Sequence, residues 1–156
     1  MSKIKLAIAD DNKDFCDILH DVLSEEKDIE ICWTANDGRK VLEEIRRDTP
    51  DVLILDNIMP YIDGFEVLEQ INGMELAKSP KIIMLTAMGN ESFTKKAISL
   101  GASYYIVKPF DLQILLKRIY SLSGIRKEEN VPAAPKSARK LIRKEEGEEM
   151  SNLEID

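Results

Sequence analysis

Residues 52–64 read VLILDNIMPYIDG, and this stretch decides the fold. Its first four residues are all aliphatic, a pattern typical of a short strand that is covered on both faces. Asp56 follows the run at once, and a loop containing Pro60 and Gly64 comes after it. A buried strand that ends on a carboxylate favours a parallel sheet, in which functional groups gather at the carboxyl ends of the strands.

Similar short apolar segments occur on either side of this run. We expect strands at residues 4–9, 29–35, 52–55, 82–85 and 104–107. Apolar residues at helical spacing between and after these segments predict five helices, the last two of which end at Gly101 and Gly124. The alternation predicts an α/β fold, a doubly wound five-stranded parallel sheet with helices on both faces.

The first helix has the clearest amphipathic pattern. Its expected buried face consists of Phe15, Ile18, Leu19, Val22 and Leu23. Asp11 or Asn12 is expected to cap its N-terminus.

Charge argues against a general nucleic-acid surface on residues 1–124. The chain has a formal net charge of -7. Residues 125–156 contain 7 basic and 8 acidic side chains, which leaves -6 on the preceding part. An acidic domain repels phosphate backbones, so we expect no direct DNA binding by it.

The cysteines and the hydropathy pattern predict a cytoplasmic protein. Cys16 and Cys32 both lie within apolar patterns, which favours free buried thiols over a disulfide or a metal site. No apolar run approaches the length of a membrane span, and we expect no membrane association.

The composition changes after Gly124. Residues 125–156 are charged and contain Pro132 and Pro135, so we expect a flexible linker or tail rather than a packed domain. The predicted division is a folded domain at 1–124 and a linker at 125–156.

Polar residues follow several of the predicted strands directly. Asp10 and Asp11 follow the first strand, Asp56 the third, Thr86 the fourth and Lys108 the fifth. Because carboxyl ends of parallel strands meet at one end of the sheet, these side chains are expected to converge. Three close carboxylates repel one another unless a cation lies among them, and Mg²⁺ is the hard ion that prefers such oxygen ligands.

Such a site suits phosphoryl transfer. Asp56 can attack phosphorus, since carboxylates are known phosphoryl acceptors. The Lys108 ammonium and the Thr86 hydroxyl can stabilise charge on the phosphoryl oxygens. The Lys108–Pro109 bond is a candidate for the cis form, which is accessible for bonds preceding proline.

The motifs together resemble the receiver domains of bacterial response regulators. The segments IADDNKDF, DVLILDNIMPYIDGFEVL, IIMLTAMG and GASYYIVKPFD carry this resemblance over residues 3–124. It implies a flavodoxin-like three-layer sandwich with strand order 2-1-3-4-5. In detail the motifs are most similar to the receivers of sporulation response regulators of endospore-forming Firmicutes, and the ending SNLEID is similar to their linkers to a DNA-binding domain.

The resemblance also implies roles for individual residues. Asp56 would be the phosphoacceptor, Thr86 and Tyr105 the switch residues, and Lys108 the phosphate partner. The Mg²⁺ ligands that it implies are Asp10, Asp11, Asp56 and the backbone carbonyl of Ile58, with Asp10 acting largely through water. Two positions differ from similar sequences: Asn57 stands where an aliphatic residue is common in the family, and Tyr105 stands where the sporulation receivers often have phenylalanine.

The implied function is a phosphorylation-dependent switch rather than an enzyme. The donor would be a histidine kinase or a histidine phosphotransferase. Phosphorylation would change the surface of the fourth helix, fifth strand and fifth helix and produce a homodimer. DNA would be bound only through an effector domain outside this chain, in the control of sporulation.

Other functions remain open on the sequence. A stand-alone receiver acting as a phosphorelay intermediate would have the same site. A Mg²⁺-dependent aspartyl phosphatase usually has a second acid two residues after its nucleophile, where this chain has Ile58. A phosphate-independent adaptor would not need the full polar set, and a flavin-binding protein would need a phosphate loop that the first strand lacks.

Overall fold

The computed structural model describes residues 3–124, and the predicted linker at 125–156 lies outside the described residues. The strands are β1 (Ile4–Ala9), β2 (Ile29–Ala35), β3 (Val52–Leu55), β4 (Lys81–Thr86) and β5 (Tyr104–Val107). The helices are α1 (Lys13–Ser24), α2 (Gly38–Arg47), α3 (Gly64–Asn72), α4 (Glu91–Ser99) and α5 (Leu112–Ser123). Within residues 3–124, no helix is long and apolar enough to cross a membrane.

The strands form one parallel sheet in the order β2-β1-β3-β4-β5, which confirms the predicted fold. Ala9 pairs with Leu55 and Leu55 with Met84, so β1, β3 and β4 advance in register toward one end. The polar residues that end or follow these strands are thereby brought to the same end of the sheet.

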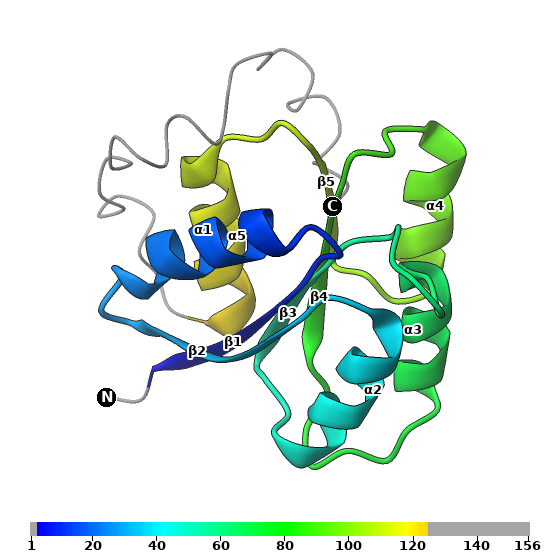
Figure 1. Cartoon of the computed structure of the whole chain (residues 1–156), viewed down its shortest axis with the longest axis horizontal. Coiled ribbons are helices and arrows are strands. Elements are labelled where there is room, and N and C mark those ends of the chain that lie inside the picture. The colour runs from blue at the N-terminus through cyan, green and yellow to red at the C-terminus, as the bar shows by residue number, and fades with distance from the viewer. Residues whose placement is uncertain (1–2, 125–156) are drawn as a thin grey trace.

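The two faces of the sheet are covered by different helices, as Figure 1 shows: α1 and α5 on one side, α2, α3 and α4 on the other. Side chains alternate between the faces along each strand. Ile54 belongs to the core beneath α1 and α5, whereas Leu53 and Leu55 belong to the other core. All four β3 side chains are buried, and burying each contributes about 1.5–3 kcal/mol.

Side-chain caps fix where each helix begins. Each cap is a short polar side chain that accepts a backbone N–H of the first turn: Asn12, Asp37, Asp63, Asn90 and Asp111. Gly101, just after α4, and Gly124, just after α5, have φ values of 108° and 87°, which is why glycine ends these helices as predicted.

One core prediction was wrong. Ile18 is 42% exposed, while Cys16 is buried together with Leu19, Val22 and Leu23. The buried face is therefore centred on positions 16, 19 and 23, and Ile18 lies to one side of it. Cys16 and Cys32 are free thiols, and burial raises the pKa of each to about 11.

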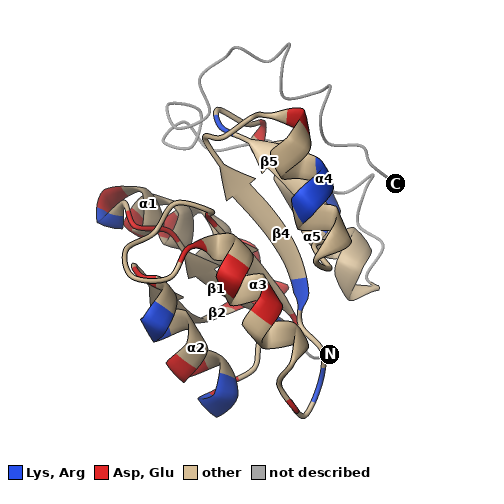
Figure 2. Ribbon diagram, turned by 90° about the vertical axis from the view of Figure 1, so that its right-hand side faces the viewer, with Lys and Arg blue, Asp and Glu red and all other residues tan. Residues whose placement is uncertain are grey.

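The outer helix faces carry both signs of charge. Figure 2 shows basic and acidic residues mixed along α2 and α4, whereas the charged residues of α3 are acidic. Such mixed faces favour solvent contact over a single-sign binding surface.

Candidate functional site

The backbone hydrogen bonding of the sheet continues for one residue beyond the ends of three strands. The N–H of Asp56 donates to Ala9 O at 2.9 Å, and that of Lys108 to Thr86 O at 2.8 Å. The N–H of Asp10 donates to Ala35 O at 3.0 Å. The residues that follow β1, β3 and β5 are therefore positioned by the same kind of backbone hydrogen bond as the strand residues.

Three carboxylates converge at this end of the sheet. One oxygen from each of Asp10, Asp11 and Asp56 lies within 4.8 Å of the others. Asp10 and Asp56 are buried, at 2% and 5% exposure, and Asp11 is exposed. The cluster thus has two acids in the protein interior and one open to solvent.

Lys108 brings the main opposing charge. Its ammonium Nζ donates to Asp10 Oδ2 at 2.6 Å and lies 4.1 Å from the centroid of the Phe15 ring. The Lys108–Pro109 peptide bond is cis, as the sequence suggested. The other Asp10 oxygen, Oδ1, accepts the N–H of Asn12 at 2.9 Å.

The pKa of the Asp56 carboxyl is shifted upward. Burial and the nearby Asp10 raise its pKa above the usual 3.8. Lys108, a hydrogen bond from the Thr86 hydroxyl and the N–H of Ile58 oppose this rise. The Ile58 N–H lies 3.4 Å from Asp56 Oδ1, so that bond is long.

The two predicted switch residues lie beside Asp56. Thr86 is completely buried, and its Oγ1 accepts the N–H of Met88 at 3.3 Å. Tyr105 is also completely buried, and its hydroxyl donates to Met88 O at 2.6 Å. Burial and the charge of Asp56 raise the Tyr105 pKa to about 12, so the hydroxyl keeps its proton as a donor.

Two contributing residues were missed from the sequence. Asn36 follows β2 and donates from Nδ2 to Asp10 O at 2.8 Å. The strand-end rule, applied to β2 as to the other strands, would have found it. Met88 contacts both Thr86 and Tyr105 from the loop between β4 and α4, and no local sequence pattern marks it.

The donor set fits a hard divalent cation. Asp10, Asp11 and Asp56 supply only carboxylate oxygens, and their mutual repulsion is what such an ion relieves. Soft metals prefer sulfur, and the nearby Cys16 donates toward backbone carbonyls with a raised pKa instead.

The chain matches the family model of the response regulator receiver domain over residues 6–120. It is similar to the signal receiver domain assigned to the response regulator NarL of Mycobacterium tuberculosis, at 25% identity and a TM-score of 0.74. That match covers 81% of this chain and 100% of the other. It is also similar to a chain of the CheX–CheY–BeF3–Mg²⁺ complex of Borrelia burgdorferi, at 30% identity and a TM-score of 0.69, over 78% of this chain and 90% of the other.

A third similar structure is the response regulator domain of CheB from Thermotoga maritima. The identity is 26% and the TM-score 0.65, with 84% of this chain and 99% of the other covered. Fold, site geometry and family match agree over the same residues. The chain therefore belongs to the receiver-domain family of two-component response regulators.

Proposed function

We propose that the chain is a phosphorylation switch in which Asp56 accepts a phosphoryl group from a phosphohistidine on a partner histidine kinase or phosphotransferase. The observation that carries the proposal is the convergence of Asp10, Asp11 and Asp56 within 4.8 Å beside Lys108 and Thr86. A Mg²⁺ ion, held by the three carboxylates and the backbone carbonyl of Ile58, would neutralise their charge and that of the phosphoryl oxygens.

In the transfer step an Asp56 carboxylate oxygen attacks phosphorus. The O–P bond forms as the P–N bond of the donor breaks, and the histidine nitrogen leaves with the bonding electrons. The raised pKa of Asp56 makes its ionised carboxylate a better nucleophile than an ordinary one. Lys108, now paired with Asp10, is placed to pair with the incoming phosphoryl oxygens.

The response would start at Thr86 and Tyr105. The Thr86 hydroxyl turns its hydrogen bond from the Asp56 carboxylate to a phosphoryl oxygen, and the β4–α4 loop follows it. The adjoining surface of α4, β5 and α5 is remodelled, and two phosphorylated chains associate through it. This is a local charge change that biases a two-state element.

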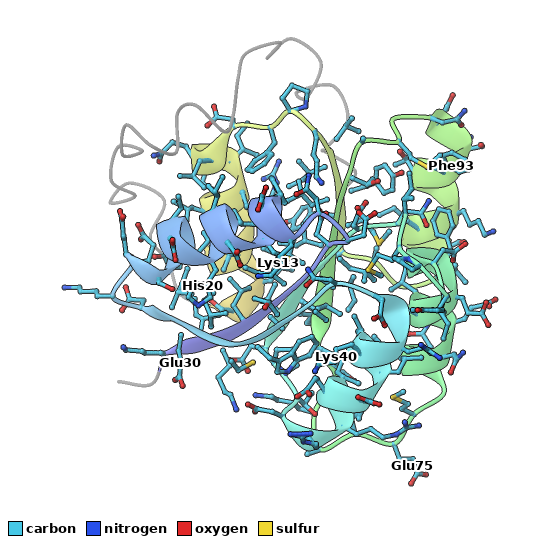
Figure 3. All side chains as sticks on the ribbon, viewed as in Figure 1. Lys13, His20, Glu30, Lys40, Glu75 and Phe93 are labelled. Atoms are coloured by element: carbon cyan, nitrogen blue, oxygen red, sulfur yellow. The ribbon has the colours of Figure 1, made fainter. Side chains whose placement is uncertain are left out.

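α4 is suited to such a change, because among its residues only Ala97 is buried. The ring of Phe93 in α4 lies against that of Phe65 in α3, with ring centroids 5.8 Å apart. Figure 3 shows Phe93 on the other side of the sheet from Lys13 of α1. A helix held by so few buried contacts shifts at small cost.

The biological output proposed is the start of sporulation, through a DNA-binding domain joined to residues 125–156. Its support is the joint resemblance of the motifs around Asp10, Asp56, Thr86 and Lys108 to sporulation receivers.

The test is to incubate the full chain with acetyl phosphate and Mg²⁺ and to measure intact mass. We expect one added phosphoryl group on the wild type and on Asp51→Asn, a matched control at the other end of the sheet, and none on Asp56→Asn. Sedimentation with beryllofluoride and Mg²⁺ should shift the wild type toward a dimer. Absence of phosphoryl uptake would contradict the switch, and uptake without a dimer would favour a single-domain relay receiver.

A further inference from the structure

Met88, in the loop between β4 and α4, makes hydrogen bonds with three polar side chains. Its N–H donates to Thr86 Oγ1 at 3.3 Å, and its carbonyl accepts the Tyr105 hydroxyl at 2.6 Å. Its sulfur accepts Asn57 Nδ2 at 3.6 Å. The three partners are the last residue of β4, a residue within β5 and a residue of the loop after β3, so Met88 links its loop to three neighbouring segments.

The side-chain oxygen of Asn57 is unusual in its lack of a hydrogen-bond partner among the described residues. The residue is 6% exposed, and its Oδ1 is buried without a hydrogen-bond partner among the described residues. An unpaired buried carbonyl oxygen destabilises a protein, so each one calls for an explanation.

The backbone of Asn57 is held closely against Gly64. Its backbone carbonyl accepts the N–H of Gly64 at 2.8 Å. The backbones of these two residues are so close that a Cβ on Gly64 would lie 2.8 Å from the Asn57 Cα. The loop therefore fixes the Asn57 backbone, and the buried side-chain amide lies against Met88.

The proposed switch supplies a donor for it. When the Thr86 hydroxyl turns to a phosphoryl oxygen on Asp56, it moves from the N–H of Met88, whose bond to Oγ1 is already long at 3.3 Å. The Met88 N–H then needs a new acceptor. Asn57 Oδ1 is an unused acceptor on the same amide that already contacts Met88.

We propose that Asn57 is a positioning residue for the phosphorylated state, in which its Oδ1 accepts the N–H of Met88. This inference rests on the proposed function and adds to it a specific role for the residue after the phosphoacceptor. The unpaired oxygen destabilises the unmodified state and becomes paired only after phosphorylation. Asn57 therefore biases the equilibrium toward the active loop, because it contributes differently in the two states.

The test compares the wild-type chain with Asn57→Leu, which keeps the branched arrangement of side-chain heavy atoms but removes the amide. Beryllofluoride with Mg²⁺ serves as the probe of the phosphorylated state. We expect Asn57→Leu to weaken beryllofluoride binding about tenfold, since Met88 N–H is left without its acceptor. Without the probe, the same variant should unfold at a higher urea concentration than the wild type.

Met88→Leu is the matched control. It removes the sulfur contact but keeps the backbone N–H, so its affinity for beryllofluoride should stay within about twofold of the wild type. A large loss in this variant would assign the effect to the sulfur and overturn the inference.

Hydrogen exchange of the Met88 amide gives a reading that needs no variant. It should slow when beryllofluoride binds the wild type, and unchanged or faster exchange would overturn the inference. Equal beryllofluoride affinity in Asn57→Leu and wild type would also overturn it, while leaving the proposed function intact. A wild type that binds no beryllofluoride and takes up no phosphoryl group would overturn both.

Discussion

The two ends of the parallel sheet both carry buried or half-buried acids, but their charges are balanced differently. At the amino end, Asp51 accepts the N–H of Lys5 at 2.8 Å and the ammonium of Lys78 at 2.7 Å, and Lys5 also pairs with Asp48. At the carboxyl end, three acids share Lys108, which donates to Asp10.

The two arrangements move acid pKa values in opposite directions. Burial tends to raise the Asp51 pKa, but the hydrogen bonds from Lys78 and Lys5 outweigh it and the pKa falls. Burial and Asp10 raise the Asp56 pKa. At the amino end Asp51 therefore contributes to stability, whereas at the carboxyl end Asp56 opposes folding, as expected of a functional site.

The largest predicted effect comes from Gly64→Ala. A Cβ at this position would lie 2.4 Å from the Asp56 carbonyl, so the loop must move. We expect a loss of about 3 kcal/mol in the free energy of unfolding, together with loss of phosphoryl uptake. Urea unfolding and intact mass measure the two effects.

Gly73→Ala is the control, near the other end of the sheet. Its φ is -93°, and its Cβ would lie 3.8 Å from the nearest atom, Gln70 O. The free energy of unfolding of Gly73→Ala should differ from that of the wild type by less than about 1 kcal/mol. Equal effects of the two substitutions would mean that the close approach at Gly64 is not needed.

Removing one charge from each end should change stability in opposite directions. Asp51→Asn removes the ion pair with Lys78 and should lower the free energy of unfolding by about 1 kcal/mol. The effect is small because this pair is partly exposed and screened by solvent. Asp56→Asn removes a crowded buried charge and should stabilise by about 1 kcal/mol. Urea unfolding at pH 7 with a chelator tests both, and destabilisation by both would contradict the comparison.

The pH dependence of these differences should separate the two acids further. The raised Asp56 pKa means that the folded state binds its proton more tightly, so stability from this group is present below pH 3.8 and is lost as the pH rises through its folded pKa. The lowered Asp51 pKa contributes stability above pH 3.8, which is lost as the pH falls through its folded value.

The advantage of Asp56→Asn over the wild type should therefore grow with rising pH, starting from near 3.8. The penalty of Asp51→Asn should disappear on acidification below 3.8. Unfolding of the three proteins between pH 3 and 7 measures both trends, and parallel curves would rule out the opposite shifts.

The smallest predicted effect is that of Tyr105→Phe. It removes the hydroxyl that donates to Met88 O at 2.6 Å, and water can replace this donor because Met88 is only half-buried. We expect the free energy of unfolding to fall by about 0.5 kcal/mol and hydrogen exchange in the β4–α4 loop to become faster. Tyr104→Phe, whose ring lies 4.8 Å from the Arg118 guanidinium, is the control and should leave this loop unchanged.

Much of the fold could be predicted because its signals are local. The apolar run at 52–55, the strand and helix alternation, and the glycines after α4 and α5 each act within a few residues. Convergence of Asp10, Asp11 and Asp56 then follows from the parallel topology alone. Their roles in phosphoryl transfer, with those of Thr86 and Lys108, stay predictions.

The rest depends on contacts between distant segments. Periodicity did not separate Ile18 from Cys16, because they lie at opposite edges of the apolar face of the helix and only packing decides which edge is buried. Nothing local indicates that Tyr105 donates to Met88, or that Asn57 Oδ1 is left unpaired. These features arise where β5 meets the loops that follow β3 and β4.

The most direct test of the account is to locate the phosphoryl group. After treatment with acetyl phosphate and Mg²⁺, borohydride reduces an aspartyl phosphate to homoserine, which marks the modified residue in a peptide digest. The account predicts homoserine at Asp56 and none at Asp51, although the two acids flank the same strand. Homoserine at Asp10, Asp11 or Asp51 in place of Asp56, or at no residue, would contradict it.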